Sequence, residues 1–424
     1  MEVAAFLIVL LASVALGVPI AFALLFCSVA LMFVMDMFDP MIIAQSIVNG
    51  ADNFTLLAIP FFVFAGEIMN VGGLAKRLID LPMKLVGHKA GGLGYVVVIA
   101  AVIMASLSGS PAADTAAIAA IMFPMMMSAK YDGPSSAGLI AAGGIIAPII
   151  PPSIPFIVIA VTAGISISKL FMAGIVPGIL MGVVLCVVWA LRSRHLPKSD
   201  KATGKEVWQA FKASIWALML PVIVIGGFKT GVFTPTEAGA VASVYALFVS
   251  ICVYRELSFK AIYESLLNTA ITTAVIMLMV ASAQVSAYLM TIADLPMLVA
   301  DLLHPLVDSP KLLMFLILIV LLLFGMVLDL IPIVLILVPV LLPLIRQAGI
   351  DETYFCFMFI FCCAVGLITP PVGNVLNVVS SVTKVPFERC VLGIAPYAGA
   401  LILFMFVMLI FPEIVIVPME WFTN

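Results

Sequence analysis

Charge is scarce in this sequence. Only 10% of its 424 residues are Asp, Glu, Lys or Arg, whereas 65% are hydrophobic and the mean hydropathy is +1.32. Such a chain cannot cover its apolar surface with polar groups in water, so we expect an integral membrane protein. The apolar segments follow one another with short gaps, which predicts one all-α polytopic membrane domain rather than several soluble domains.

Other absences exclude further classes of function. The sequence has no basic tract suited to nucleic acid, so nucleic-acid binding is set aside. Its three histidines do not cluster, and its seven cysteines have neither zinc-type spacing nor the even framework of a secreted disulfide protein. We therefore expect free thiols, no metal centre built from histidine or cysteine, and membrane lipid as the surrounding medium.

A string of landmarks recurs in the same order in the two halves of the chain. Asp114 and Pro124 reappear 215 positions later as Asp329 and Pro339, and from Asp132 onward the shift is 219. A four-residue insertion after Pro339 would account for the change of offset. The chain is therefore predicted to be a duplicated unit, as in many secondary transporters. The further matches are Asp132 with Asp351, Pro151-Pro152 with Pro370-Pro371, Gly174-Ile175 with Gly393-Ile394, and Pro177 with Pro396.

The apolar runs and their interruptions predict the boundaries of the two repeats. The first repeat covers residues 1–191, with a re-entrant hairpin at 91–127 and a broken helix at 136–165. The second covers residues 214–424, with a hairpin at 311–345 and a broken helix at 353–383. The polar residues 192–213 are predicted to be a cytoplasmic linker. Other spans are predicted at 3–17, 20–35, 41–70, 169–191, 214–229, 236–254, 265–291 and 390–412.

The distribution of Lys and Arg predicts the orientation of the chain. With both termini in the periplasm, four of the 19 basic residues lie on the periplasmic side, namely Lys169, Lys229, Lys311 and Arg346, and the other 15 lie in cytoplasmic loops. Five full crossings in each half would then place the repeats upside down relative to each other, as an inverted repeat.

Two connecting segments are predicted to link fixed and moving parts. Residues 73–88 alternate Leu and Ile with Lys and Arg at helical spacing, which is typical of a helix lying in the membrane interface. Residues 294–308 are the acidic counterpart in the second half. The alternative is that both are ordinary amphipathic connectors.

Polar, glycine- and proline-rich breaks interrupt four of the apolar runs. They lie at residues 106–111, 147–153, 325–332 and 366–374. Carbonyl and hydroxyl oxygens at a helix break can hold a hard cation, and the N-terminus of the next half-helix offers N–H donors to an anion. Pairing each hairpin with the broken helix of its own repeat predicts two quasi-equivalent sodium sites. The alternatives are that the proline pairs are simple kinks and that the serines bond within their own helix.

Asp114 and Asp329 are ionisable groups inside predicted spans, where a charge is costly and normally faces a cavity or a partner. Three roles remain open for them: a helix cap, support of a sodium site, or proton transfer. A competing hypothesis is an intramembrane aspartyl protease that uses both acids as a dyad. Neither acid stands in a Gly-x-Gly-Asp motif, so we expect no enzyme. For Glu67 an interface or pairing role is favoured.

Motifs along the whole chain resemble the large membrane subunit of the tripartite ATP-independent periplasmic (TRAP) transporters. Their order and spacing together carry the likeness. They are Ile59-Pro60-Phe61-Phe62 up to Gly66, Gly72-Gly73-Leu74-Ala75, the Ser108-Gly109-Ser110 hairpin with Ala113-Asp114, Pro151-Pro152-Ser153, Thr234-Pro235-Thr236-Glu237-Ala238, and Thr369-Pro370-Pro371-Val372-Gly373.

The resemblance implies sodium-driven uptake of an organic acid, such as a C4-dicarboxylate or a sialic acid, across the bacterial inner membrane. It implies as partners a periplasmic substrate-binding protein and a small four-helix membrane subunit, and an elevator-type carrier in which a transport domain moves against a scaffold. A stand-alone sodium/carboxylate symporter is the alternative.

The resemblance also implies the site residues. It places sodium site 1 on Ser106, Ser108, Gly109, Ser110, Ala147, Ile150 and Pro152, sodium site 2 on Gly325, Met326, Asp329, Gly366, Thr369, Pro371 and Gly373, and the substrate contacts on Ser110, Asp114, Ser153, Asn374 and Asn377.

Overall fold

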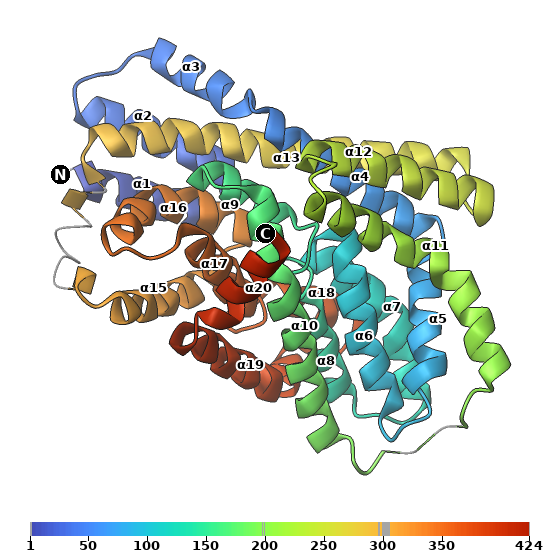
Figure 1. Cartoon of the computed structure of the whole chain (residues 1–424). Helices are drawn as coiled ribbons and strands as arrows, with labels where there is room; N and C mark the ends of the chain where they lie inside the picture. The colour runs from blue at the N-terminus through green and yellow to red at the C-terminus, as the bar shows by residue number, and fades with distance from the viewer. Residues whose placement is uncertain (1, 197, 199, 296, 299–305, 424) are drawn as a thin grey trace.

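The chain is all-helical in the part that the structure describes. This structure is a computed structural model, and it describes residues 2–196, 198, 200–295, 297–298 and 306–423 (Figure 1). Eight of the helices in those ranges are long and apolar enough to cross a membrane. The prediction of an all-α polytopic membrane protein is therefore confirmed.

The helices of the first half end where the polar linker begins. They are α1 (Glu2–Ala15), α2 (Ile20–Val34), α3 (Pro40–Ala51), the short η1 (Phe54–Leu57), α4 (Ala58–Val71), α5 (Leu74–Val86), α6 (Gly92–Ser108), α7 (Pro111–Ser128), α8 (Gly133–Gly144), α9 (Ile154–Ala163) and α10 (Ile167–Arg192).

The helices of the second half follow a parallel order. They are α11 (Gly204–Lys229), α12 (Pro235–Phe248), the short η2 (Val249–Val253), α13 (Phe259–Ile292), α15 (Pro310–Gly325), α16 (Leu330–Gln347), α17 (Glu352–Gly366), α18 (Asn374–Thr383), α19 (Phe387–Ile410) and α20 (Glu413–Thr423).

Local sequence explains the first break. Helix α6 stops because Gly109 adopts a left-handed conformation with φ of 62°. Helix α7 starts with Pro111 at a position where no backbone donor is needed, and the Ser110 hydroxyl accepts a hydrogen bond from the N–H of Ala113 at 3.4 Å. Two residues, Gly109 and Ser110, therefore separate the two helices.

Reciprocal packing relates the two repeats. Helix α7 packs on α18 of the other repeat, and its counterpart α16 packs on α9. In the same way α8 packs on α19, and α17 packs on α10 (Figure 1). Exchanged contacts of this kind follow from a two-fold relation between equivalent units. The breaks of both repeats are thereby brought to the centre of the molecule.

The structure corrects the register of the repeat. Helix α7 begins at Pro111 and α16 begins at Leu330, 219 positions later, and the two helices end at Ser128 and Gln347, which is again 219 positions. At this constant offset Asp329 corresponds to Ser110 and not to Asp114. The four-residue insertion inferred after Pro339 is therefore wrong.

Several predicted boundaries also differ. The span expected at 41–70 is divided into α3 and α4, because Asn53 caps a new turn by accepting the N–H of Thr55 at 2.9 Å. Helix α11 starts at Gly204, inside the predicted linker 192–213, because Thr203 and Glu206 form a capping box there. Helix α20 follows the last predicted span. The connector expected at 294–308 lies largely outside the described residues.

Polar contacts fall into two groups that match the predicted sides of the membrane. On the predicted cytoplasmic side, Arg77 of α5 binds Glu256 at 2.7 Å, and Lys84 lies 3.5 Å from Glu206. On the predicted periplasmic side, Arg346 binds Glu352 at 2.9 Å. Residues that the charge distribution assigns to one side thus contact residues assigned to the same side.

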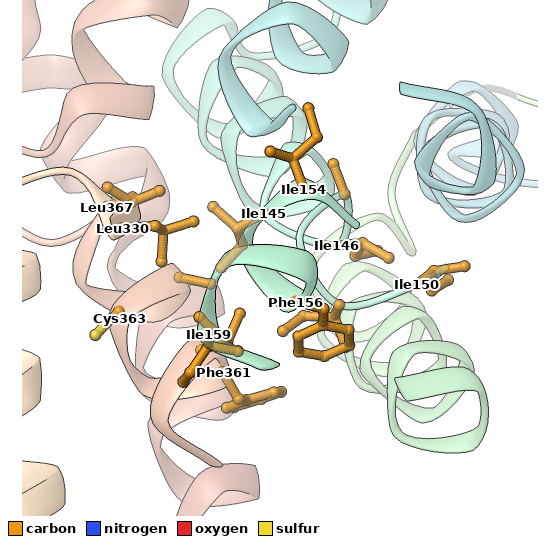
Figure 2. Close-up of a cluster of buried hydrophobic side chains, with 14 of the residues drawn as sticks. Ile145, Ile146, Ile150, Ile154, Phe156, Ile159, Leu330, Phe361, Cys363 and Leu367 are labelled. Atoms are coloured by element: carbon orange, nitrogen blue, oxygen red, sulfur yellow. The ribbon is translucent and has the colours of Figure 1, made fainter. Parts of the chain in front are cut away.

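The core between the two breaks is apolar. Figure 2 shows Ile145 and Ile154, from the two ends of the first break, in one buried cluster with Leu330 and Leu367 of the second repeat. Phe156 lies on the far side of the same cluster and is fully buried. Burial of these side chains holds the interrupted segments of both repeats together.

Candidate functional site

One cavity brings the breaks of both repeats together. Its volume is about 440 Å³. One side, which we call the break wall, is formed by the α6–α7 and α15–α16 connections and by the first residues of α9 and α18. The other side, which we call the α4–α13 wall, is formed by those two helices. The polar residues of the break wall are Ser108, Ser110, Asp329 and Asn374, and those of the α4–α13 wall are Glu67, Asn70 and Thr272.

The first hairpin connection lies directly on the first break. A Cβ atom at Gly109 would stand 2.6 Å from the carbonyl oxygen of Pro152 and 3.1 Å from the backbone nitrogen of Ile154. Only a residue without a side chain allows this approach, and its left-handed conformation also favours glycine. The first hairpin and the first broken helix are therefore in contact, as the predicted pairing requires.

The second hairpin connection is joined to the second break by backbone hydrogen bonds. The carbonyl oxygen of Met326 accepts the N–H groups of Val372 and Gly373, each at 3.2 Å. Beside them, a Cβ atom at Gly366 would lie 2.6 Å from the backbone of Gly325. The second pairing is also present, and both lone pairs of the Met326 carbonyl are engaged by protein donors.

The structure places only part of the predicted sodium-site residues on the cavity. Ser108, Gly109, Ser110 and Asp329 line it, whereas the other predicted ligands do not. Two of the predicted hydroxyls bond within their own helices: Ser106 donates to the carbonyl of Ile103 at 2.6 Å, and Thr369 to that of Val365 at 2.8 Å. The predicted ligands that do not line the cavity are Ser106, Ala147, Ile150, Pro152, Gly325, Met326, Gly366, Thr369, Pro371 and Gly373.

The predicted substrate contacts divide in the same way. Ser110 and Asn374 line the cavity, but Asp114, Ser153 and Asn377 do not. Ser153 is fully buried and caps α9 by accepting the N–H of Phe156 at 3.2 Å. The Asn377 amide donates to the carbonyl of Val372 at 2.9 Å. These two side chains shape the breaks rather than the cavity.

Asp114 lies behind the first hairpin connection. Only 2% of its surface is exposed, and one carboxylate oxygen, Oδ1, accepts the hydroxyl of Ser108. Within the described part of the chain the other oxygen, Oδ2, has no hydrogen-bond partner. Because the Ser108 hydroxyl also accepts the N–H of Ser110 at 3.2 Å, Asp114 fixes the orientation of a residue that lines the cavity.

Asp329 has different surroundings. Its carboxylate caps α16 by accepting the N–H of Leu330 at 2.8 Å, and it lines the cavity. A protease dyad requires two carboxyl groups that share one site and one proton. Asp114 is engaged with Ser108 behind the connection, so the two acids occupy separate environments.

Sequence reasoning did not place the polar residues of the α4–α13 wall at the site, although it favoured an interface or pairing role for Glu67. Glu67 accepts a hydrogen bond from the amide of Asn268 at 3.4 Å, and Asn70 lies one helical turn further along α4. The signal for Glu67 was a carboxylate within an apolar run, which by itself does not place the residue in a cavity. Thr272 gave no comparable signal, because hydroxyls are common in spans and often bond their own helix.

The charge of the cavity is negative. Two carboxylates line it, those of Glu67 and Asp329, and none of the lining residues that the structure describes is Lys, Arg or His. In the described ranges there is also no group of three or more His, Cys, Asp and Glu side chains that could hold a metal ion. A cation in this cavity would therefore need backbone carbonyls and hydroxyls in addition to these carboxylates.

Comparisons with known proteins identify the family. Residues 7–414 match the family described as "Tripartite ATP-independent periplasmic transporter, DctM component". The chain is 60% identical over 423 residues to the 2,3-diketo-L-gulonate TRAP transporter large permease protein of Escherichia coli, covering 99% of this chain and 100% of that protein. It is 36% identical to the sialic acid TRAP transporter large permease protein of Vibrio cholerae, with 96% of each covered.

A further relative supports the same family, and a solved structure supports the fold. The C4-dicarboxylate TRAP transporter large permease protein of Pseudomonas aeruginosa is 34% identical, with 89% of each chain covered. The YdaH transporter of Alcanivorax borkumensis, described as having an unusual topology, superposes with a TM-score of 0.63 at 14% identity and covers 90% of this chain and 88% of its own. That likeness concerns the fold alone. The chain belongs to the tripartite ATP-independent periplasmic transporters, as a large membrane subunit of that family.

Proposed function

We propose that this large subunit carries out sodium-coupled secondary uptake of a small organic acid across the bacterial inner membrane. The observation that carries the proposal is the cavity at which both hairpins and both broken helices meet. Irregular backbone at membrane depth is tolerated where it is buried in protein or lines a wet cavity. The breaks here meet both conditions, since some of their residues are buried and others line the cavity.

The negative charge of the cavity supports coupling to a cation. An organic acid that enters between Glu67 and Asp329 meets two like charges and no basic side chain among the described lining residues. Its binding therefore requires cations, which the carbonyl and hydroxyl oxygens at the breaks can hold. Each positive charge that enters through an inside-negative potential of about 100 mV contributes about 2.3 kcal/mol.

The N-terminus of α18 supports binding of the acid's carboxylate. Three of the four half-helices that follow a break are capped by a side chain, which comes from Ser110, Ser153 or Asp329. Helix α18 follows Gly373, which has no side chain to cap it, and its first residue, Asn374, lines the cavity. The N–H of Val375 is bonded to the carbonyl of Leu367, but the positive end of the helix dipole at Asn374 still favours a negative group.

Partners and substrate class follow from the relatives. By their names those proteins serve 2,3-diketo-L-gulonate, sialic acid or C4-dicarboxylates. We propose that this chain likewise receives an organic acid from a periplasmic binding protein and works with a small membrane subunit. The concentration of 15 of the 19 Lys and Arg residues on one side supports an orientation with both termini in the periplasm.

The two walls suggest how transport proceeds. In an elevator motion the break wall would carry the acid and its cations past α4 and α13, which stay fixed. Helix α5 joins α4 to α6, and its Arg77 is held by Glu256 at 2.7 Å, so it would serve as the arm between the two parts.

The test is uptake into proteoliposomes that contain this chain and its small subunit. We expect accumulation of an organic acid that requires an inward sodium gradient, is accelerated by an inside-negative potential, and depends on the binding protein. Uptake indifferent to sodium and to potential would contradict the proposal. Uptake with sodium but without the binding protein would instead favour a stand-alone symporter.

A further inference from the structure

We propose that Glu67 makes this transporter selective for acids with one carboxylate and several hydroxyl groups, and against dicarboxylates. The inference rests on the proposed transport of organic acids and adds the class of acid. It concerns the α4–α13 wall, which faces the part of the substrate that the breaks do not bind.

Glu67 is held in the cavity by a neighbour on the opposite helix. The Asn268 amide of α13 donates to its Oε2 atom at 3.4 Å, which joins α4 to α13. In the described part of the chain no hydrogen bond involves Oε1 of Glu67. One carboxylate oxygen thus remains an acceptor for a ligand.

The neighbours of Glu67 extend the same chemistry. Asn70 lies on the same face of α4 one turn away, and Thr272 reaches the cavity from α13. Their amide and hydroxyl groups can each donate and accept hydrogen bonds. Together with the Glu67 carboxylate they form a surface that matches the hydroxyl groups of a sugar acid.

The same wall is unsuited to a second carboxylate. A dicarboxylate whose first carboxylate binds at the break wall would bring its other charge towards Glu67. No basic residue stands among the described lining residues to offset the repulsion. Like charges at close range in a partly desolvated site disfavour each other, and hydrogen bonds from hydroxyls to a carboxylate are among the stronger ones.

The experiment measures binding of two probe acids to the purified chain in lipid nanodiscs with sodium chloride. Gluconate carries one carboxylate, and each of its remaining carbons carries a hydroxyl. Succinate carries a carboxylate at each end and no hydroxyl. We expect wild-type protein to bind gluconate more tightly than succinate. We expect Glu67→Gln to lower this preference by about tenfold, which corresponds to about 1.4 kcal/mol.

Two further variants make the test specific. Glu264→Gln removes the same charge from α13 at an exposed position 3.7 Å from Lys260, outside the cavity, and should leave the preference unchanged. Glu67→Asp keeps the charge and should retain most of the preference, which provides a second reading if Glu67→Gln is poorly folded. Asn70→Ala should weaken gluconate several-fold and leave succinate unaffected.

The outcomes separate this inference from the function on which it rests. If binding depends on sodium but Glu67→Gln leaves the preference for gluconate unchanged, the role of Glu67 in selectivity is overturned and the transport function still stands. Tighter binding of succinate than of gluconate by wild-type protein would overturn it as well. If neither acid shows sodium-dependent binding, the proposed transport function itself is contradicted.

Discussion

The two hairpin connections occupy equivalent places but differ in length and charge. The first consists of two residues, Gly109 and Ser110, and the second of four, residues 326–329. The residue that caps the following helix is neutral in the first repeat, Ser110, and acidic in the second, Asp329. The duplication thus preserved the backbone position of the cap, while the chemistry presented to the cavity diverged.

The acid of the first repeat serves a different purpose. Asp114 lies in the first turn of α7 and binds the hydroxyl of Ser108 from behind, whereas Asp329 faces the cavity. In the proposed site the first hairpin connection is therefore ordered indirectly, through Asp114, whereas the second presents the charge of Asp329 directly. Four predictions test the two repeats and the contacts that support them, in order of decreasing effect.

Two close helix approaches should be equally intolerant of a side chain, one between α19 and α8 and one between α10 and the first break. A Cβ atom at Gly393 of α19 would overlap the carbonyl of Pro134, with its carbon at 2.5 Å, and one at Gly174 of α10 would overlap the carbonyl of Ile149. We expect Gly393→Ala and Gly174→Ala each to lower the free energy of unfolding by about 3 kcal/mol. Thermal unfolding in detergent measures this.

The matched control for this prediction lies in the same helix. Gly399 of α19 has no atom within 4 Å of a Cβ position, so Gly399→Ala should leave the unfolding temperature unchanged or raise it slightly. A large loss at Gly393 with none at Gly174 would contradict the close approach of α10 to the first break.

Substitution of the two acids should affect different properties: Asp114→Ala mainly stability, and Asp329→Ala mainly sodium-dependent uptake. Asp114→Ala leaves the Ser108 hydroxyl without its acceptor, and we expect a loss of about 2 kcal/mol in stability. Asp329→Ala removes a helix cap worth about 1 kcal/mol but should reduce sodium-dependent uptake more strongly than its effect on stability explains. Unfolding and uptake are measured on the same preparations. Equal losses of stability and of uptake in both variants would contradict the different roles assigned to Asp114 and Asp329.

The neutral cap of the first repeat should follow ordinary capping energetics. We expect Ser110→Ala to lower stability by about 1 kcal/mol and Ser110→Gly by only a few tenths, because glycine tolerates the cap conformation. Chemical or thermal unfolding of both variants provides the measurement. No loss of stability in Ser110→Ala would mean that the hydroxyl does not act as the cap.

The smallest effect concerns the arm helix α5. The guanidinium of Arg77 donates a hydrogen bond to Glu256 and holds the pKa of that carboxyl below its ordinary value of 4.5. A lowered folded pKa stabilises the protein above the ordinary value, and this stabilisation is lost as the pH falls through the folded pKa. Because Glu256 is largely exposed, we expect at most about 1 kcal/mol.

The measurement compares unfolding of wild-type protein and Glu256→Gln between neutral and acidic pH. Wild type should be the more stable at neutral pH, and the difference should shrink as the solution is acidified below pH 4.5. A difference that grows on acidification would contradict the assigned sign.

The sequence predicted the positions of the helix breaks better than it predicted which side chains face the cavity there. Gly109, Pro111 and the proline pairs mark helix ends by local rules that hold in any fold. The register of the acids was not recoverable in this way, because α16 contains prolines at both 339 and 343, and Pro124 matches the first at an offset of 215 and the second at 219. Glu67 was seen as an acid in a span, but its place in the cavity depends on how α4 and α13 pack, which no local pattern records.

The central claim is that both repeats bring their breaks to one cavity where cations and an organic acid bind together. The most direct measurement is a cryo-EM structure in lipid nanodiscs with sodium and a bound acid. We predict density for the acid between Asn374 and Glu67, with sodium density at the connections beside Ser110 and Asp329. Lipid density separating the two hairpin connections, or an acid bound elsewhere, would contradict the account.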